Sequence, residues 1–313
     1  MLLKVENLVK TYGRATALGG VSFSVEAGEI VGFLGPNGAG KSTAMNIITG
    51  YISSNTGKVY VDGEEILENP TAVKKKIGYL PEQPPLYPEL TVDEYLNFVY
   101  DLRGCELPRQ AHLNEICTAV HINDIRTRLI RNLSKGYKQR LGIAAALVGD
   151  PPLIILDEPT VGLDPKEIIG VRNLIRALGK KHTVILSTHI LSEAQAVCDR
   201  MIIINRGKIA ADGKTAEIDR FIKDNRRYKV TVCGSQNEVL PLLRSISGIV
   251  RAEITSERDG DAAAYLVEAA SGIEIRKTLF YTLAQHDLPI FGLEAVGESL
   301  EDVFLKLTER EGK

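Results

Sequence analysis

The 313-residue sequence predicts an α/β fold with a parallel sheet, followed by a smaller α+β domain. Three observations lead to this fold class. Residues 29–34, 153–156 and 183–187 are short apolar runs, typical of strands that are buried on both faces. Segments with helical signals separate these runs, as expected for a parallel sheet. From residue 228 onward the predicted order is strand, helix, strand, strand, helix, strand, which is the order of a ferredoxin-like layer.

The composition is that of an ordinary globular protein, and the length suggests two domains. A formal net charge of −2 argues against a dedicated nucleic-acid binder. No apolar run approaches the roughly 20 residues that span a bilayer, and the N-terminus lacks the apolar core of a signal peptide. The four cysteines are scattered without a CxxC pair, so we expect reduced thiols and no zinc site.

A glycine-rich loop follows the strand at residues 29–34 and precedes a short apolar helix. Strand, glycine loop and helix in this order are the context that a P-loop requires. Backbone N–H groups and the helix N-terminus would face the phosphates, Lys41 would reach the β- and γ-phosphates, and the Ser42 hydroxyl would hold Mg²⁺. The sequence therefore predicts a nucleoside triphosphate site. Its residues are Gly35, Pro36, Asn37, Gly38, Ala39, Gly40, Lys41, Ser42 and Thr43.

Two further strands end in residues that suit phosphate chemistry. Asp157 and Glu158 follow the apolar run 153–156, and His189 follows the run 183–187. Ligands meet an open parallel sheet at the carboxyl ends of its strands. Two adjacent carboxylates there are costly unless a cation or a reaction uses them. We predict that Asp157 binds Mg²⁺ and that Glu158 and His189 are catalytic.

Other segments allow more than one interpretation. Residues 1–34 favour short strands, and Tyr12 at a turn could either stack on a flat base or pack at the edge of a sheet. Residues 91–132 predict a mostly helical insertion that opens with a capping box of Thr91 and Glu94. Ser134 is placed to cap the next helix, and the local sequence does not distinguish it from any other capped helix.

A charged stretch at 219–227 predicts the domain boundary, giving domains 1–218 and 219–313. The second domain is expected to end in a helix at residues 299–310. It carries no constellation of chemically active residues, so we expect an interaction or regulatory module.

Taken together, these motifs resemble the ATP-binding subunit of an ABC transporter over residues 1 to about 215. Residues 35–42 correspond to the Walker A motif, residues 153–157 with Glu158 to the Walker B, Asp164 to the D-loop and His189 to the switch histidine. Tyr12 stands where this family places its adenine-stacking aromatic. The resemblance implies a P-loop ATPase core with an antiparallel β subdomain and a helical subdomain at about residues 91–145.

Two motifs depart from the usual family pattern. The signature, commonly Leu-Ser-Gly-Gly-Gln, reads Leu133-Ser134-Lys135-Gly136-Tyr137. The Q-loop glutamine aligns with Glu82, and a glutamine follows at Gln83; which of the two senses Mg²⁺ and the membrane partner stays open. With the C-terminal extension, these variants look like ABC-2-type exporter ATPases, similar to drug-resistance, sodium-efflux and gliding-motility-associated proteins.

The resemblance also implies a mechanism. Two copies would pair head to tail, each ATP lying between one P-loop and the other copy's signature. Asp157, Ser42 and Glu82 would hold Mg²⁺, Glu158 would be the general base, and His189 would contact the γ-phosphate and the attacking water. A separate integral membrane permease would be the partner, with the homodimer at the cytoplasmic face of the membrane and no nucleic acid.

The sequence argues against two alternative functions. A soluble, non-transport ABC ATPase of translation or repair would carry two fused halves, long coiled coils or zinc sites, and none is visible in the sequence. A scaffold that only binds ATP is disfavoured by the presence of Asp157, Glu158 and His189.

Overall fold

The computed structural model describes residues 1–218, 227–270 and 272–296. The chain divides into two compact units, one over Met1–Thr215 and a second that begins at Ala216. The charged residues 219–226 and the helix predicted at 299–310 lie outside the described residues. Within the described part, no helix has the length and apolar character that crossing a membrane requires.

The first unit contains an antiparallel sheet in the order β2-β1-β4-β5. Val21, Phe23 and Val25 of β2 are buried, as their alternation predicts. β1 and β2 have 10 and 11 residues, so the prediction of short strands was wrong here. Register shifts along their ladder let the pairing continue through a bend, with Asn7 at φ 46°. The strands are β1 (Leu3–Tyr12), β2 (Ala15–Val25), β4 (Thr56–Val61) and β5 (Glu64–Glu65).

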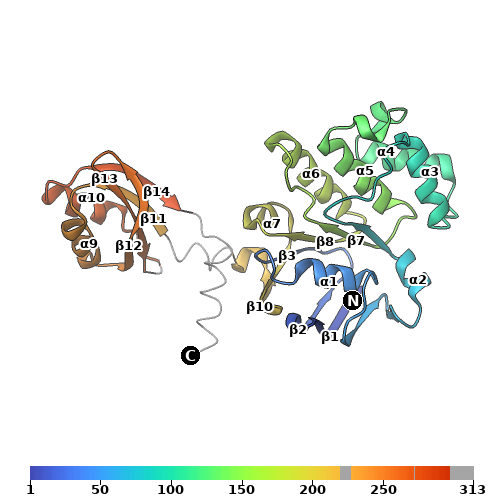
Figure 1. Ribbon diagram of the computed structural model, residues 1–313, viewed down its shortest axis with the longest axis horizontal. Coiled ribbons are helices and arrows are strands. Elements are labelled where there is room, and N and C mark those ends of the chain that lie inside the picture. Colours follow the sequence, from blue (N-terminus) through green and yellow to red (C-terminus); the bar gives the residue numbers. More distant parts are fainter. Residues whose placement is uncertain (219–226, 271, 297–313) are drawn as a thin grey trace. The chain divides into compact units, whose positions relative to one another are not determined.

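A six-stranded sheet forms the centre of this unit, in the order β10-β9-β3-β8-β7-β6 (Figure 1). All neighbours pair in parallel except β10, which is antiparallel to β9. Every residue of β3, β7 and β8 is buried, which confirms the prediction of doubly covered strands. The strands are β3 (Ile30–Leu34), β6 (Ile77–Leu80), β7 (Leu153–Asp157), β8 (Thr183–Thr188), β9 (Arg200–Asn205) and β10 (Lys208–Lys214).

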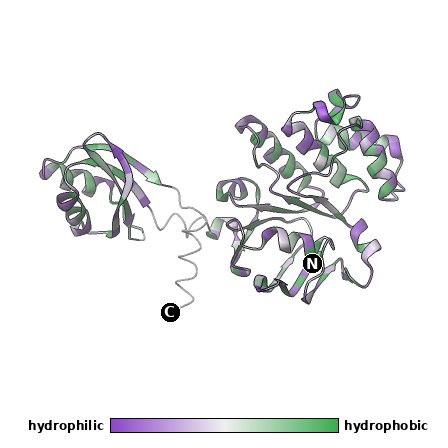
Figure 2. Cartoon of the chain, in the orientation of Figure 1, coloured by the Kyte–Doolittle hydropathy of each residue, from purple (hydrophilic) through white to green (hydrophobic). Residues whose placement is uncertain are grey.

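Helices cover both faces of the central sheet. The apolar side chains of α1 (Lys41–Ile48) pack in one core with residues of the antiparallel sheet and with Phe33, Ile155 and Ile185 of the central sheet. The opposite face is covered by α6 (Pro165–Leu178) and α7 (Leu191–Val197), which contact β8 and β3. Hydrophobic and hydrophilic residues are interleaved along the helices (Figure 2).

The insertion between β6 and β7 is helical, as predicted. Thr91 and Glu94 form the predicted capping box at the start of α3. The helices α3, α4 and α5 contact one another and lie together in Figure 1. The helical elements of the unit not yet given are α2 (Pro70–Lys75), α3 (Val92–Leu102), α4 (Arg109–Ala119), η1 (Asn123–Ile125), η2 (Ile130–Asn132) and α5 (Lys135–Leu147).

The second unit has an antiparallel sheet in the order β12-β13-β11-β14, with a core that includes Tyr228, Tyr265 and Leu279. The two outer strands are the second and the fourth of the unit, as in a ferredoxin-like layer. The predicted α+β fold is therefore confirmed. The elements are β11 (Arg227–Cys233), α9 (Gln236–Ser245), β12 (Ile249–Asp259), β13 (Ala262–Ala269), α10 (Arg276–Gln285) and β14 (Ile290–Val296).

Candidate active site

The site lies where four adjacent parallel strands, β3, β8, β7 and β6, reach their carboxyl ends. The P-loop follows β3, Thr188 ends β8 and His189 follows it, Asp157 ends β7, and Glu82 lies two residues after β6. Along the chain these strands follow in the order β3, β6, β7, β8, which differs from their order in the sheet. Pairing within the sheet therefore brings the residues at their ends together.

The P-loop forms one wall of a cavity of about 300 Å³. Gly40 precedes α1 with φ 107°, a left-handed conformation that favours glycine. Lys41 is buried, and its Nζ donates to the carbonyl oxygens of Gly35 at 2.8 Å and Pro36 at 3.4 Å. The cavity is lined by Ala17, Asn37, Gly38, Gly40, Lys41, Ser42, Thr43, Glu82, Glu158, Val161 and His189.

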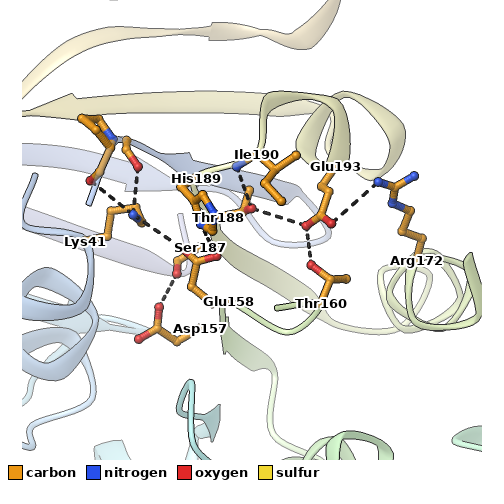
Figure 3. A network of polar contacts seen from close by, with 12 residues as sticks. Lys41, Asp157, Glu158, Thr160, Arg172, Ser187, Thr188, His189, Ile190 and Glu193 are labelled. Atoms are coloured by element: carbon orange, nitrogen blue, oxygen red, sulfur yellow. Dashed lines mark hydrogen bonds and ion pairs between the residues drawn. The ribbon is translucent and has the colours of Figure 1, made fainter. Parts of the chain in front are cut away.

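Glu158 joins the P-loop to the end of β8. Its Oε1 lies 3.4 Å from the Nζ of Lys41, and its Oε2 lies 2.9 Å from the Nδ1 of His189 (Figure 3). The backbone of Glu158 has φ 48°, a left-handed conformation that is unusual for a side-chain-bearing residue. Strained backbone of this kind persists only where the surroundings hold it in place.

Asp157 lies beside this network at the end of β7. It is buried, and the hydroxyl of Ser187 on the neighbouring strand β8 donates to its carboxylate. Burial raises the pKa of Asp157 above its ordinary value, and the adjacent carboxylate of Glu158 adds to the increase. Hydrogen bonds from Ser187 and Ser42 act in the opposite direction. The buried carboxyl group is therefore in an environment that a cation would stabilise.

Ser42 at the start of α1 and Asp157 at the end of β7 would supply two oxygen ligands to a metal. Among the described residues no group of three or more His, Cys, Asp and Glu side chains could hold a metal ion. Two protein oxygens, from Ser42 and Asp157, fit Mg²⁺, which commonly binds one or two protein oxygens together with substrate phosphates and water.

The two candidate Q-loop residues differ in position. Glu82 lines both the 300 Å³ cavity and an adjacent cavity of about 400 Å³, whereas Gln83 lines only the adjacent one. Both follow β6 in irregular backbone. Lys135 and Lys138 of the signature helix also line the adjacent cavity. Glu82 is therefore the residue of the pair that reaches the P-loop side.

The signature does not line the P-loop cavity of its own chain. Ser134 caps α5, and its hydroxyl oxygen accepts the backbone N–H of Tyr137 at 3.3 Å, as predicted. Gly136 is buried, and a Cβ at this position would lie 2.1 Å from Oε1 of Glu167, near the start of α6. The signature thus packs closely against the segment that follows the D-loop.

Asp164 and Tyr12, the predicted D-loop and base-stacking residues, lie outside the P-loop cavity. Asp164 caps α6, with its carboxylate accepting the N–H of Glu167 at 2.9 Å. Tyr12 is 53% exposed at the end of β1 and does not line the cavity, although Ala17 of the paired strand does. Lys10 lies over its ring at 5.4 Å. The Tyr12 ring is thus accessible for stacking on a base.

A buried carboxylate near Glu158 and His189 was not predicted from the sequence. Glu193 lies in the first turn of α7 with 3% of its surface exposed, and its carboxylate accepts hydrogen bonds from Thr160 and Thr188. The available signal was its position on the same helix face as the buried Ala194 and Val197. An acidic residue on an apolar face predicts a buried partner.

A family model and curated relatives both relate this chain to ABC transporters. The family model described as ABC transporter matches residues 18–161. The chain is 33% identical to the linearmycin resistance ATP-binding protein LnrL of Bacillus subtilis (strain 168), covering 99% of both chains. It is 32% identical to the bacitracin transport ATP-binding protein BcrA of Bacillus licheniformis, covering 98% of this chain and 97% of that one.

Solved structures give the same result for the first unit. The ATP-binding subunit of an ABC transporter is 33% identical, with a TM-score of 0.64, over 71% of this chain and 94% of that chain. The ATP-binding cassette MJ0796, solved as a dimer in a post-hydrolysis state with ADP and Pi, is 29% identical, with a TM-score of 0.63. That match covers 68% of this chain and 99% of the cassette.

Proposed function

This chain belongs to the ATP-binding proteins of ABC transporters, and we propose that it drives export through a separate ABC-2-type permease. It binds ATP and hydrolyses it for transport. The proposal of export is supported by relatives named for linearmycin resistance and bacitracin transport. The alternative, a non-transport ABC ATPase, finds no support among these relatives.

The observation that carries the chemical part of the proposal is the contact of Glu158 with both Lys41 and His189. Lys41 would bind the β- and γ-phosphates, and Glu158 would accept a proton from the attacking water. His189 would orient Glu158 and contact the γ-phosphate. Mg²⁺, when bound, would neutralise phosphate charge, with Ser42 and Asp157 as its protein ligands and Glu82 close to it.

We further propose that the working form is a homodimer closed by ATP. In one chain the P-loop cavity receives no residue from the signature, whose Ser134, Lys135, Gly136 and Tyr137 lie at the start of α5. The N-terminus of a 13-residue helix offers unpaired N–H groups to an anion. A second copy would supply them to the nucleotide, and the dimeric MJ0796 cassette supports this arrangement.

A groove of about 540 Å³ beside the Q-loop segment would receive the permease. Its lining combines residues of the core, the segment 81–85 and the helical subdomain, including Tyr51, Tyr79, Tyr95 and Leu102. Tyr51 and Leu102 are strongly exposed and line the same groove, and an exposed apolar patch of this kind marks an interaction site. The homodimer would then lie at the cytoplasmic face of the membrane.

The test is co-purification of the tagged full-length chain from detergent-solubilised membranes. We expect an integral membrane protein with about six apolar spans to be recovered with it. Leu102→Glu should abolish recovery while ATP binding is retained, and Leu67→Glu, at an exposed site outside the groove, should have no effect. Recovery that is unchanged by Leu102→Glu would refute the groove, and the absence of any membrane protein would refute the permease proposal.

A further inference from the structure

A buried carboxylate lies next to the catalytic network without belonging to it. Glu193 on α7 is 3% exposed, and a buried carboxylate is costly unless hydrogen bonds or a cation compensate it. Arg172 on α6 is a distant partner, with a terminal nitrogen 3.8 Å from Oε1 of Glu193. The Nε of Arg172 is itself buried without a hydrogen-bond partner among the described residues. Arg172 provides an opposite charge at this distance, and the hydroxyls of Thr160 and Thr188 donate hydrogen bonds to the carboxylate (Figure 3).

These two hydroxyls come from the two segments that carry the catalytic side chains. Thr160 lies two residues after Glu158, and Thr188 immediately precedes His189. Both hydroxyls donate to the same carboxylate oxygen, Oε2 of Glu193, at 3.4 Å in the case of Thr188. Glu193 thus links the segment that follows β7 to the last residue of β8 through hydrogen bonds. These are the same two segments that carry Glu158 and His189.

Each threonine hydroxyl has one O–H to donate, and the Glu193 carboxylate accepts from both. The Thr188 oxygen is then free to accept the backbone N–H of Ile190, at 3.0 Å. This second hydrogen bond spans His189 and holds the backbone on both of its sides.

The backbone of Glu158 also needs such support. Its φ of 48° is an unfavourable backbone conformation for a residue with a side chain and must be maintained by its surroundings. The hydrogen bond from Thr160 to Glu193 anchors the turn that immediately follows it. The 2.9 Å contact between Glu158 and His189 depends on both anchored segments.

We propose that Glu193 is a positioning residue for ATP hydrolysis, which sets the spacing of Glu158 and His189 through Thr160 and Thr188. The inference rests on the proposed roles of Glu158 and His189. The carboxylate of Glu193 does not line the nucleotide cavity. A change at Glu193 would therefore affect the rate of the chemical step and not the binding of ATP.

The test is Glu193→Leu in the full-length chain, with the turnover number, ATP affinity and melting temperature measured together. Leucine is close to glutamate in size and removes both acceptor oxygens, whereas glutamine would keep one oxygen that can accept both hydroxyls. We expect the turnover number to fall about 10- to 100-fold, the scale of a small misplacement of catalytic groups, with ATP affinity changed less than about twofold. Glu115→Leu, which removes an exposed carboxylate paired with Lys181, is the matched control and should retain parent turnover.

A double-mutant comparison separates positioning from general stability. Thr160→Val removes one hydroxyl with little change of shape, and it should lower turnover in the same way. Because Glu193 is proposed to act through both Thr160 and Thr188, adding Glu193→Leu to Thr160→Val should cost less than Glu193→Leu costs in the parent chain, the remaining loss being the link through Thr188. Parent turnover in Glu193→Leu with only a lower melting temperature would overturn the proposal, as would fully multiplicative losses in the double variant.

The same assays distinguish failure of this inference from failure of the proposed function. Parent turnover in Glu158→Gln would refute the catalytic role of Glu158 itself. Loss of turnover in Glu158→Gln together with parent turnover in both Glu193→Leu and Thr160→Val would refute only the positioning role.

Discussion

Replacing Glu158 with glutamine tests the centre of the proposed mechanism. The amide has the size of the carboxylate and keeps one oxygen, but it cannot take a proton from water. Lys41 retains its hydrogen bonds to the carbonyl oxygens of Gly35 and Pro36, so the P-loop should stay folded. The variant should therefore bind ATP and fail to hydrolyse it.

The expected loss of hydrolysis rate in Glu158→Gln follows from the proposed role of Glu158 as the general base. General base catalysis contributes about 10²- to 10⁴-fold to a rate. Each tenfold loss corresponds to 1.36 kcal/mol, so the barrier should rise by about 3–5 kcal/mol. Glu158 also contacts Lys41 at 3.4 Å and His189 at 2.9 Å, which places the expected loss toward the upper part of this range.

The assay is phosphate release by the full-length chain, with ATP affinity measured by equilibrium binding and mass by light scattering. With ATP present, Glu158→Gln should persist as a dimer, whereas the parent chain should return to monomers after hydrolysis. Glu115→Gln serves as the control for loss of a carboxylate far from the cavity. Hydrolysis by Glu158→Gln at the parent rate would show that this residue is not the base.

Three further predictions concern binding, assembly and pH. Lys41→Ala should lose ATP binding, because the buried ammonium that faces the phosphates is removed; undiminished affinity in a binding titration would refute the P-loop assignment. Ser134→Arg should block ATP-driven dimerisation by crowding the exposed start of α5 while each monomer still binds ATP, and normal dimers in light scattering would argue against the shared site. Asp157→Asn should raise the melting temperature of the nucleotide-free chain at neutral pH, since the raised pKa of this carboxyl means that its ionised form destabilises the fold. The gain should diminish as the pH falls and the native Asp157 becomes protonated, and a gain independent of pH would exclude this origin.

Much of the fold was predictable because its signals are local. The buried runs of β3, β7 and β8, the capping box of Thr91 and Glu94, and the period-two alternation in β2 each lie within a few consecutive residues. The strand and helix order of the second unit was predicted for the same reason. The length of β1 and β2 was not, because bulges in a ladder depend on the partner strand.

The proposed catalytic side chains were predicted individually, and their contacts were not. Lys41 was predicted from the glycine-rich loop, and Glu158 and His189 were predicted from their places at strand ends. The hydrogen bond between Glu158 and His189 joins residues 31 positions apart. The positive φ of Glu158 carries no sequence signal. Glu193 was missed because a single acidic residue in a short helix is usually exposed.

The sequence by itself determined that this chain binds a nucleoside triphosphate, because the P-loop is a contiguous segment whose glycines and lysine act together. Only the tertiary structure decided which groups surround that nucleotide site. The sheet order β3-β8-β7 places His189 and Glu158 next to the P-loop, although both lie far along the chain from it. Parallel pairing aligns the carboxyl ends of these strands, and the buried hydrogen bonds of Glu193 then link two of them.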